Sequence, residues 1–192
     1  MAESYYNNLG ELSIFNSKFI NNSIQGNYST GGVIYSSKGF LTLFNSTISN
    51  TTLNSGYHSL GGAISIWDGR NTYIINSTIS GNNIKGNYVY GSAIAHKGVL
   101  LEIINSTISN NYANGSSVAN STVYNMNGNY HFENTNFTAN GISAVKSNVL
   151  SCLEDQLIIS DIVDIDSLGD LPSSYDLRDF GLVASVKNQF CR

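Results

Sequence analysis

The sequence predicts an all-β fold, a parallel β-helix (solenoid) of about five coils. The first observation is a motif that returns along the chain, clearest as Asn-Ser-Thr-Ile-Ser at residues 45–49, 76–80 and 105–109. The second is a marker that begins at Gly32, Gly62, Ser92 and Ser121, each followed two residues later by Ile or Val. Two independent markers in step indicate a structural repeat.

Weaker copies of the first motif begin at Asn16 and Asn134, so the five leading asparagines recur at a nearly constant interval of about 30 residues. Within a repeat, apolar residues alternate with polar ones in short runs, as at Leu41, Leu43 and Ile48. This alternation predicts half-buried strands, and the Asn and Gly residues between the runs favour tight bends. Because so short a unit cannot bury its apolar face alone, the units are expected to stack.

The coils are expected at about 3–31, 32–61, 62–91, 92–120 and from there to about 145. The polar segments 51–60 and 82–90 are expected to project as loops, which would carry any ligand surface. Aromatic side chains there could stack on a sugar, or could simply pack at the rim of the solenoid. The candidate contact residues are Tyr57, His58, Tyr88, Tyr90 and Tyr112.

A polar position recurs six residues after each leading asparagine, and Thr51 occupies it in the second coil. Stacked about 4.8 Å apart, side-chain amides there could bond along the solenoid axis as a ladder. The alternative is a row of exposed turn asparagines, each bonded to its own backbone. The candidate ladder residues are Asn22, Asn82, Asn111 and Asn140.

The repeat resembles the right-handed β-helix repeats of large microbial surface proteins, including the adhesin-like proteins of methanogenic archaea. The residues that carry the resemblance are the Gly-Gly-Val/Ala-Ile and Asn-Ser-Thr-Ile-Ser-x-Asn cores, and it spans about residues 3–148. It implies a right-handed helix, an extracellular or cell-surface location and a role as a stalk or as a binding module for a cell-surface or polysaccharide ligand. The fold alone does not select a function, because β-helices also host enzymes.

Composition limits the other functional classes. Charged residues are 11% of the chain and the formal net charge is -4, so the electrostatic footprint of a nucleic-acid-binding protein is absent. A polysaccharide lyase or glycoside hydrolase is the alternative function, but it needs clustered carboxylates. We interpret Asp68 and Arg70 as an isolated salt link, and no metal-binding or cofactor-binding motif is found in the sequence. The acids that precede Glu133 are only Glu3, Glu11, Asp68 and Glu102.

Asparagine is unusually frequent, and nine Asn-x-Ser/Thr sequons occur. Some sequons could carry glycan in a secreted protein, although a repeat made of Asn, Ser and Thr creates them by chance. Cys152 and Cys191 do not establish a disulfide framework. No stretch reaches the length of a membrane span. Because residues 3–16 align without a gap onto 32–45, we expect the chain to be part of a longer protein.

The C-terminal part differs in composition. Residues 149–170 are acidic and without Lys or Arg, which predicts a linker; the alternative is a short packed segment that closes the last coil. Residues 171–192 contain Leu-Pro, Asp-x-Arg, Gly-x-Val and Val-Lys-Asn-Gln in that order, and they resemble the mature N-terminus of papain-like cysteine peptidases.

The resemblance implies that Gln189 occupies the oxyanion-hole position and that the intact parent protein cleaves peptides. The residues after Gln189 depart from the family pattern, and the nucleophilic Cys and its His and Asn partners are missing. We therefore expect this chain to have no peptidase activity by itself.

Overall fold

The computed structural model describes residues 5–119, 121–140 and 143–147, and within them the chain is all β-structure with no helix. Most strands are short, because a bend residue interrupts the chain every few positions, and only β8, β9 and β12 exceed eight residues. They are β1 (Tyr5–Asn8), β2 (Glu11–Phe15), β3 (Lys18–Ile20), β4 (Ser23–Thr30), β5 (Ile34–Ser37), β6 (Phe40–Phe44), β7 (Thr47–Ser49), β8 (Thr52–Leu60), β9 (Ile64–Ile75), β10 (Thr78–Ser80), β11 (Asn83–Tyr90), β12 (Ile94–Ile104), β13 (Thr107–Ser109), β14 (Tyr112–Ala119), β15 (Ser121–Asn125), β16 (Asn129–Glu133), β17 (Asn136–Thr138) and β18 (Ser143–Ser147).

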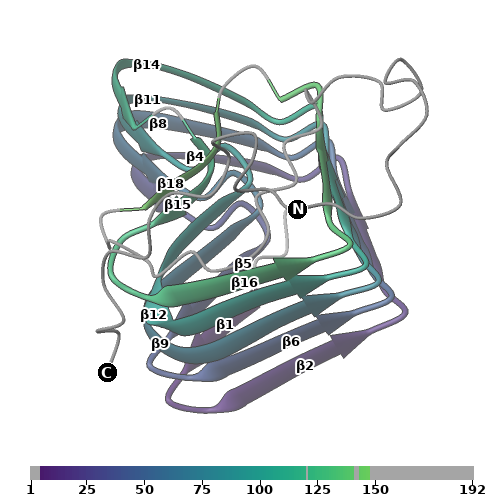
Figure 1. The fold of residues 1–192 in the computed structure, drawn as a ribbon. Helices are drawn as coiled ribbons and strands as arrows, with labels where there is room; N and C mark the ends of the chain where they lie inside the picture. Colours follow the sequence, from purple (N-terminus) through teal and green to yellow (C-terminus); the bar gives the residue numbers. More distant parts are fainter. Residues whose placement is uncertain (1–4, 120, 141–142, 148–192) are drawn as a thin grey trace, which may run out of the picture. The chain divides into compact units, whose positions relative to one another are not determined.

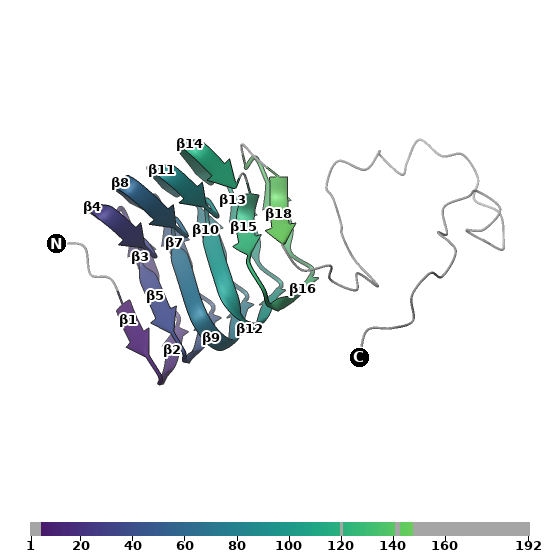
Figure 2. The same ribbon diagram turned by 90° about the vertical axis from the view of Figure 1, so that its left-hand side faces the viewer.

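These strands build three parallel sheets that run the length of the solenoid (Figures 1 and 2). Sheet A is the largest, and in it β9 and β12 each replace a pair of strands that the first two coils keep separate. Sheet B contains β3, β7, β10, β13 and β17. Sheet C contains β4, β8, β11 and β14. The predicted parallel β-solenoid is therefore confirmed, with about four turns in the described residues where about five coils were expected.

The difference in count comes from the last coil. Each of the first four coils contributes a strand to all three sheets, whereas β18, the next described strand after β17, belongs to sheet A. β18 pairs with β15, and Ser143 aligns with Ser121, so this coil is shorter than those before it. Among the described residues, sheet C therefore has four strands and ends at β14.

Matching apolar residues of successive coils stack inside the solenoid, because the strands pair in parallel and in register. Ile48, Ile79 and Ile108 form one such column in sheet B and are fully buried. Sheets A and B share one large core, whereas sheet C has a small one built on Leu53, Ile84 and Val89. A fully buried aliphatic side chain stabilises the fold by about 1.5–3 kcal/mol.

The corners of the coils are built by residues that tolerate a positive φ. The leading asparagines Asn45, Asn76 and Asn105 have φ of 46°, 50° and 48° where the chain passes from sheet A to sheet B. Gly61 and Gly91, with φ of 63° and 70°, return the chain from sheet C to sheet A. The repeat motif is therefore a strand flanked by bend residues.

One sequence prediction about the fold is wrong. Segments 51–60 and 82–90, expected to project as loops, are largely β8 and β11 of sheet C. Their inward positions carry Leu53, Ser59, Ile84 and Val89, so the apolar alternation is diluted by serine and is hard to recognise in the sequence. The expected linker at 149–170 and the papain-like segment at 171–192, with Gln189, Cys152 and Cys191, lie outside the described residues. No helix among the described residues is long and apolar enough to cross a membrane.

Candidate ligand-binding face

The outer face of sheet C carries a cluster of aromatic rings from three successive coils. We call Tyr28, Tyr57, His58, Tyr88 and Tyr90 the aromatic cluster. The register of the strands places Tyr28, His58 and Tyr88 side by side on β4, β8 and β11. Four of the five residues were candidates from the sequence, and their position on adjacent strands brings them together.

A β-bulge in β8 adds a ring to this cluster. β8 has nine residues where β4 and β11 have eight, and the register shifts beside Gly56 and Tyr57 on both sides of the strand. The Ser55 hydroxyl lies 2.6 Å from the His58 carbonyl oxygen and 2.7 Å from that of Asn27, which fixes the bulge. Bulges re-aim side chains, and here the second coil presents both Tyr57 and His58 on the outer face.

The rings pack mainly against one another. The His58 ring is stacked with Tyr28 at 5.8 Å and with Tyr88 at 4.9 Å between ring centroids, with interplanar angles of 23° and 25°. Tyr57 stands nearly perpendicular to His58, 4.6 Å away. Because Tyr28 and Tyr88 cover both faces of His58, a sugar cannot stack flat on this ring, and the expected stacking of a sugar on the cluster stays a prediction. The cluster offers ring edges and phenol hydroxyls instead.

Two of the phenol groups are exposed, and that of Tyr57 stays protonated at neutral pH. Tyr28 is 71% exposed and Tyr57 is 41% exposed. The neighbouring Tyr88 raises the pKa of Tyr57, because two phenolates would repel each other and because a hydrogen bond between the side chains favours the neutral form. At neutral pH Tyr57 is therefore a hydroxyl that can both donate and accept.

A row of polar side chains runs beside the aromatic cluster. Gln25, Asn54, Lys85 and Asn114 align in register on β4, β8, β11 and β14, and all four are exposed. We call them the amide row. Within the described residues no hydrogen bond engages their side chains. No acidic residue belongs to any strand of sheet C, so this face combines free amides, one cation and aromatic rings.

For two aromatic residues the structure differs from the sequence prediction. Tyr112 aligns with Asn83 at the start of sheet C, five residues before the position of Tyr88, so it does not join the aromatic cluster. Tyr28 was missed from the sequence. The signal that could have found it is the repeat itself, because the Asn-Tyr pairs at Asn27 and Asn87 occupy matching positions of their coils.

The asparagine position after the sheet B strands is an internal ladder over the later coils. The Asn82 amide donates to Asn111 Oδ1 at 2.8 Å, and the Asn111 amide donates to Asn140 Oδ1 at 3.2 Å. The backbone N–H groups of Thr51, Asn82 and Asn111 donate to the amide oxygen of the next coil. Asn22 is not part of the ladder: Thr51 stands between it and Asn82, and the Asn22 amide nitrogen has no partner among the described residues.

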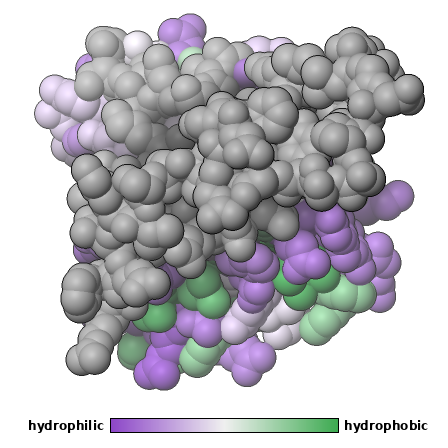
Figure 3. Space-filling view, in the orientation of Figure 1, coloured by the Kyte–Doolittle hydropathy of each residue, from purple (hydrophilic) through white to green (hydrophobic). Residues whose placement is uncertain are grey.

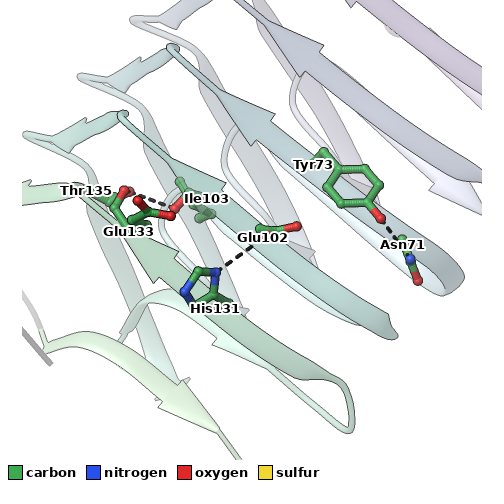
Figure 4. A network of polar contacts seen from close by, with 7 residues as sticks. All are labelled: Asn71, Tyr73, Glu102, Ile103, His131, Glu133 and Thr135. Atoms are coloured by element: carbon green, nitrogen blue, oxygen red, sulfur yellow. Dashed lines mark hydrogen bonds and ion pairs between the residues drawn. The ribbon is translucent and has the colours of Figure 1, made fainter. Parts of the chain in front are cut away.

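The acidic residues lie elsewhere, on sheet A. Glu102 Oε1 is 3.2 Å from His131 Nδ1, and Tyr73 and His131 are its register neighbours on adjacent coils (Figure 4). The expected salt link between Asp68 and Arg70 is wrong. Asp68 pairs with Lys97 at 2.7 Å, and Arg70 lies over the Phe40 ring, because neighbours across coils approach more closely than neighbours along an extended strand.

Sheet A also carries most of the exposed apolar side chains outside the aromatic cluster. In Figure 3, green hydrophobic patches lie among purple ones over the lower part of the solenoid, where Figure 1 places β2, β6, β9 and β12. Phe15, Phe40 and Val99 are among the exposed residues. Single apolar side chains on a surface are common and indicate no particular ligand.

Within the described residues no group of three or more His, Cys, Asp or Glu side chains is placed to hold a metal ion. In comparisons with known proteins, no family model, no curated protein and no solved structure matches the chain. The outer face of sheet C is therefore selected as the candidate site by its geometry and chemistry alone.

Proposed function

We propose that this chain is the β-solenoid binding module of an adhesin-like surface protein and that it binds polysaccharide through the outer face of sheet C. The observation that carries the proposal is the combination of aromatic cluster and amide row on one face that holds no carboxylate. Tyrosines supply rigid amphipathic contacts, and amides supply both donors and acceptors. A ligand rich in hydroxyl groups matches this chemistry.

The resemblance of the C-terminal segment adds a second element to the proposal. The intact protein would be a surface papain-like cysteine peptidase that the solenoid anchors or presents, and this chain would be inactive by itself. The support is the motif series that ends at Gln189, which lies outside the described residues. Purified chain under reducing conditions is expected to cleave no peptide substrate, and thiol-dependent turnover would contradict this.

The alternative, an enzyme that cleaves polysaccharide on the solenoid, has weaker support. A hydrolase uses two carboxyl groups that flank the scissile bond. The nearest arrangement is Glu102 with Glu133 on the next strand, and Glu102 is paired with His131. Release of reducing sugar that Glu102→Gln abolishes would favour the enzyme over the binding module.

Co-sedimentation of the purified chain with a panel of insoluble polysaccharides tests the binding proposal. The expected result is retention on at least one polysaccharide and loss of retention in Tyr28→Ala/Tyr57→Ala, whose two side chains are exposed and lie outside the core, so they should not be needed for folding. Tyr73→Ala on sheet A is the matched control and should bind like the parent chain. Equal retention of all three proteins, or none on any polysaccharide, would contradict the proposal.

A further inference from the structure

The amide row and the aromatic cluster both run across the strands, parallel to the solenoid axis. Gln25, Asn54, Lys85 and Asn114 are consecutive register partners, so their spacing is that of neighbouring strands, about 4.8 Å. Four such positions span about 14 Å. Along β11, Lys85 and Tyr88 are three residues apart, which separates the two rows by about 10 Å.

The amide row and the row of rings continue from coil to coil only in this direction. Along the axis a ligand meets an amide or amine at every coil on one side and an aromatic ring at three coils on the other. Along β11 the outward side chains Asn83, Lys85 and Asn87 also offer amides and an amine, but they lie about 6.7 Å apart and have no row of rings beside them. A polymer with a short, uniform repeat therefore fits the axis and not the strands.

The chemistry also restricts the polymer. The strands of sheet C contain no carboxylate, and Lys85 is the one cation of the amide row, so charge does not select the ligand. The rings of Tyr28, His58 and Tyr88 turn their faces toward one another, so they contact a ligand through edges and hydroxyls. Neutral hydroxyl groups, repeated at about the strand spacing, are what such a double row can bind. An extended β-1,4-linked chain of pyranose sugars advances by about the strand spacing for each sugar. Successive sugars are turned over, but each of them presents hydroxyl groups at both of its edges.

We propose that sheet C binds a neutral, extended β-1,4-linked polysaccharide along the solenoid axis, between the amide row and the aromatic cluster, with one sugar unit per coil. This inference rests on the proposed polysaccharide-binding function and adds the class, direction and length of the bound chain. Because the amide row has four members, four consecutive sugar units fill the site.

Calorimetric titration with β-1,4-linked glucose oligosaccharides of two to six units tests the inference. Affinity should rise at least ten-fold from two to four units and then remain constant. α-1,4-linked glucose oligosaccharides of equal length, which coil, should show no such rise. Affinity independent of length, an equal rise in the α-linked series, or no binding of the β-linked series would overturn the inference.

Two variants shorten the site without touching a hydrogen bond of the fold. Gln25→Ala and Asn114→Ala each remove one end of the amide row, and each should move the plateau from four units to three. Thr78→Ala on sheet B is the control and should leave the plateau at four. An unmoved plateau in folded variants would contradict the assignment of one sugar per coil. The inference fails alone if the co-sedimentation panel shows binding but these length effects are absent, whereas absent co-sedimentation removes the proposed function as well.

Discussion

Sheets B and C share the same coils but differ in how strictly they repeat. In sheet B the middle three strands have the identical sequence Thr-Ile-Ser and pair without a shift. In sheet C the strands vary in sequence, one carries a bulge, and the outer face gathers the aromatic cluster. Strict repetition marks the side of the solenoid that stacks the coils, and divergence marks the side that is free to acquire a ligand.

The buried polar groups also repeat strictly beside sheet B and vary in sheet C. At the corner before sheet B, Ser46, Ser77 and Ser106 are almost fully buried, and each hydroxyl donates to the carbonyl oxygen two residues earlier at 2.8 Å. The same oxygens of Ser77 and Ser106 accept from the backbone of the preceding coil. Buried polar groups stabilise a fold only when they are satisfied. In sheet C the buried serines differ: the Ser59 hydroxyl donates to the Lys85 carbonyl oxygen at 2.9 Å, whereas the Ser29 hydroxyl has no partner among the described residues.

The largest expected effect compares equal truncations in the two sheets. Ile79→Ala in sheet B should lower the free energy of unfolding by about 4 kcal/mol and Ile84→Ala in sheet C by about 2–3 kcal/mol. Both side chains are fully buried, but Ile84 belongs to the small core, whose neighbours Ile24 and Ala113 are partly exposed and can close the cavity. Urea unfolding measures both. Equal losses would show that the two sheets are equally tightly packed.

A second prediction concerns the ladder that joins the two sheets. Asn111→Ala should lower the free energy of unfolding by about 2–3 kcal/mol, because it removes the oxygen that accepts from the Asn82 amide and the Asn82 N–H, and the amide that donates to the Ile79 carbonyl group. Asn82→Thr places in the third coil the residue that Thr51 supplies naturally in the second, and it should cost less. Asn83→Ala, on the exposed face, is the control and should change stability by less than about 0.5 kcal/mol. A loss in the control equal to that of Asn111→Ala would contradict the role of the ladder.

The third prediction uses pH. Burial lowers the pKa of His96, and its hydrogen bond to Asn125, with Nδ1 2.8 Å from Oδ1, acts in the opposite direction. The unfolded chain therefore takes up a proton at higher pH than the folded chain. Stability should be constant above about pH 6.5 and fall as the pH drops below it, by about 1.4 kcal/mol for each unit that separates the folded and unfolded pKa values.

The measurement is urea unfolding between pH 7.5 and 5, with a variant as control. His96→Asn supplies an amide at this position. Asn7 occupies the matching position of sheet A three coils earlier, because Asn7, Ser36, Ile66 and His96 align in register. The substitution should flatten the pH dependence. An unchanged slope in His96→Asn would contradict the assignment of the pH dependence to His96.

The difference between sheets B and C also explains which parts of the fold could be predicted from the sequence. The period, the parallel stacking and the corners at Asn45 and Asn76 could be predicted, because stacking in register requires the same residue type at each coil. Sheet C could not, because inward serines such as Ser55 and Ser59 make buried strands resemble polar loops. The partners of Asp68 and Arg70 were also missed, because contacts across coils depend on the register, which shifts by one residue between β9 and β12 at Asp68.

The last prediction has the smallest expected effect on stability, and it tests whether the irregularity of sheet C serves ligand binding. Deletion of Gly56 would make β8 as long as β4 and β11 and remove the bulge beside Tyr57. Gly56 is exposed and the inward residues on both sides keep their places, so the free energy of unfolding should change by less than about 1 kcal/mol. Polysaccharide binding should fall at least ten-fold, because Tyr57 would move to the position that Asn27 and Asn87 occupy in the neighbouring coils and would leave its place against His58 in the aromatic cluster. If binding survives the deletion while Tyr57→Ala abolishes it, the hydroxyl-bearing ring matters and its placement by the bulge does not. If both variants bind normally, sheet C diverges from the repeat for a reason unrelated to this ligand.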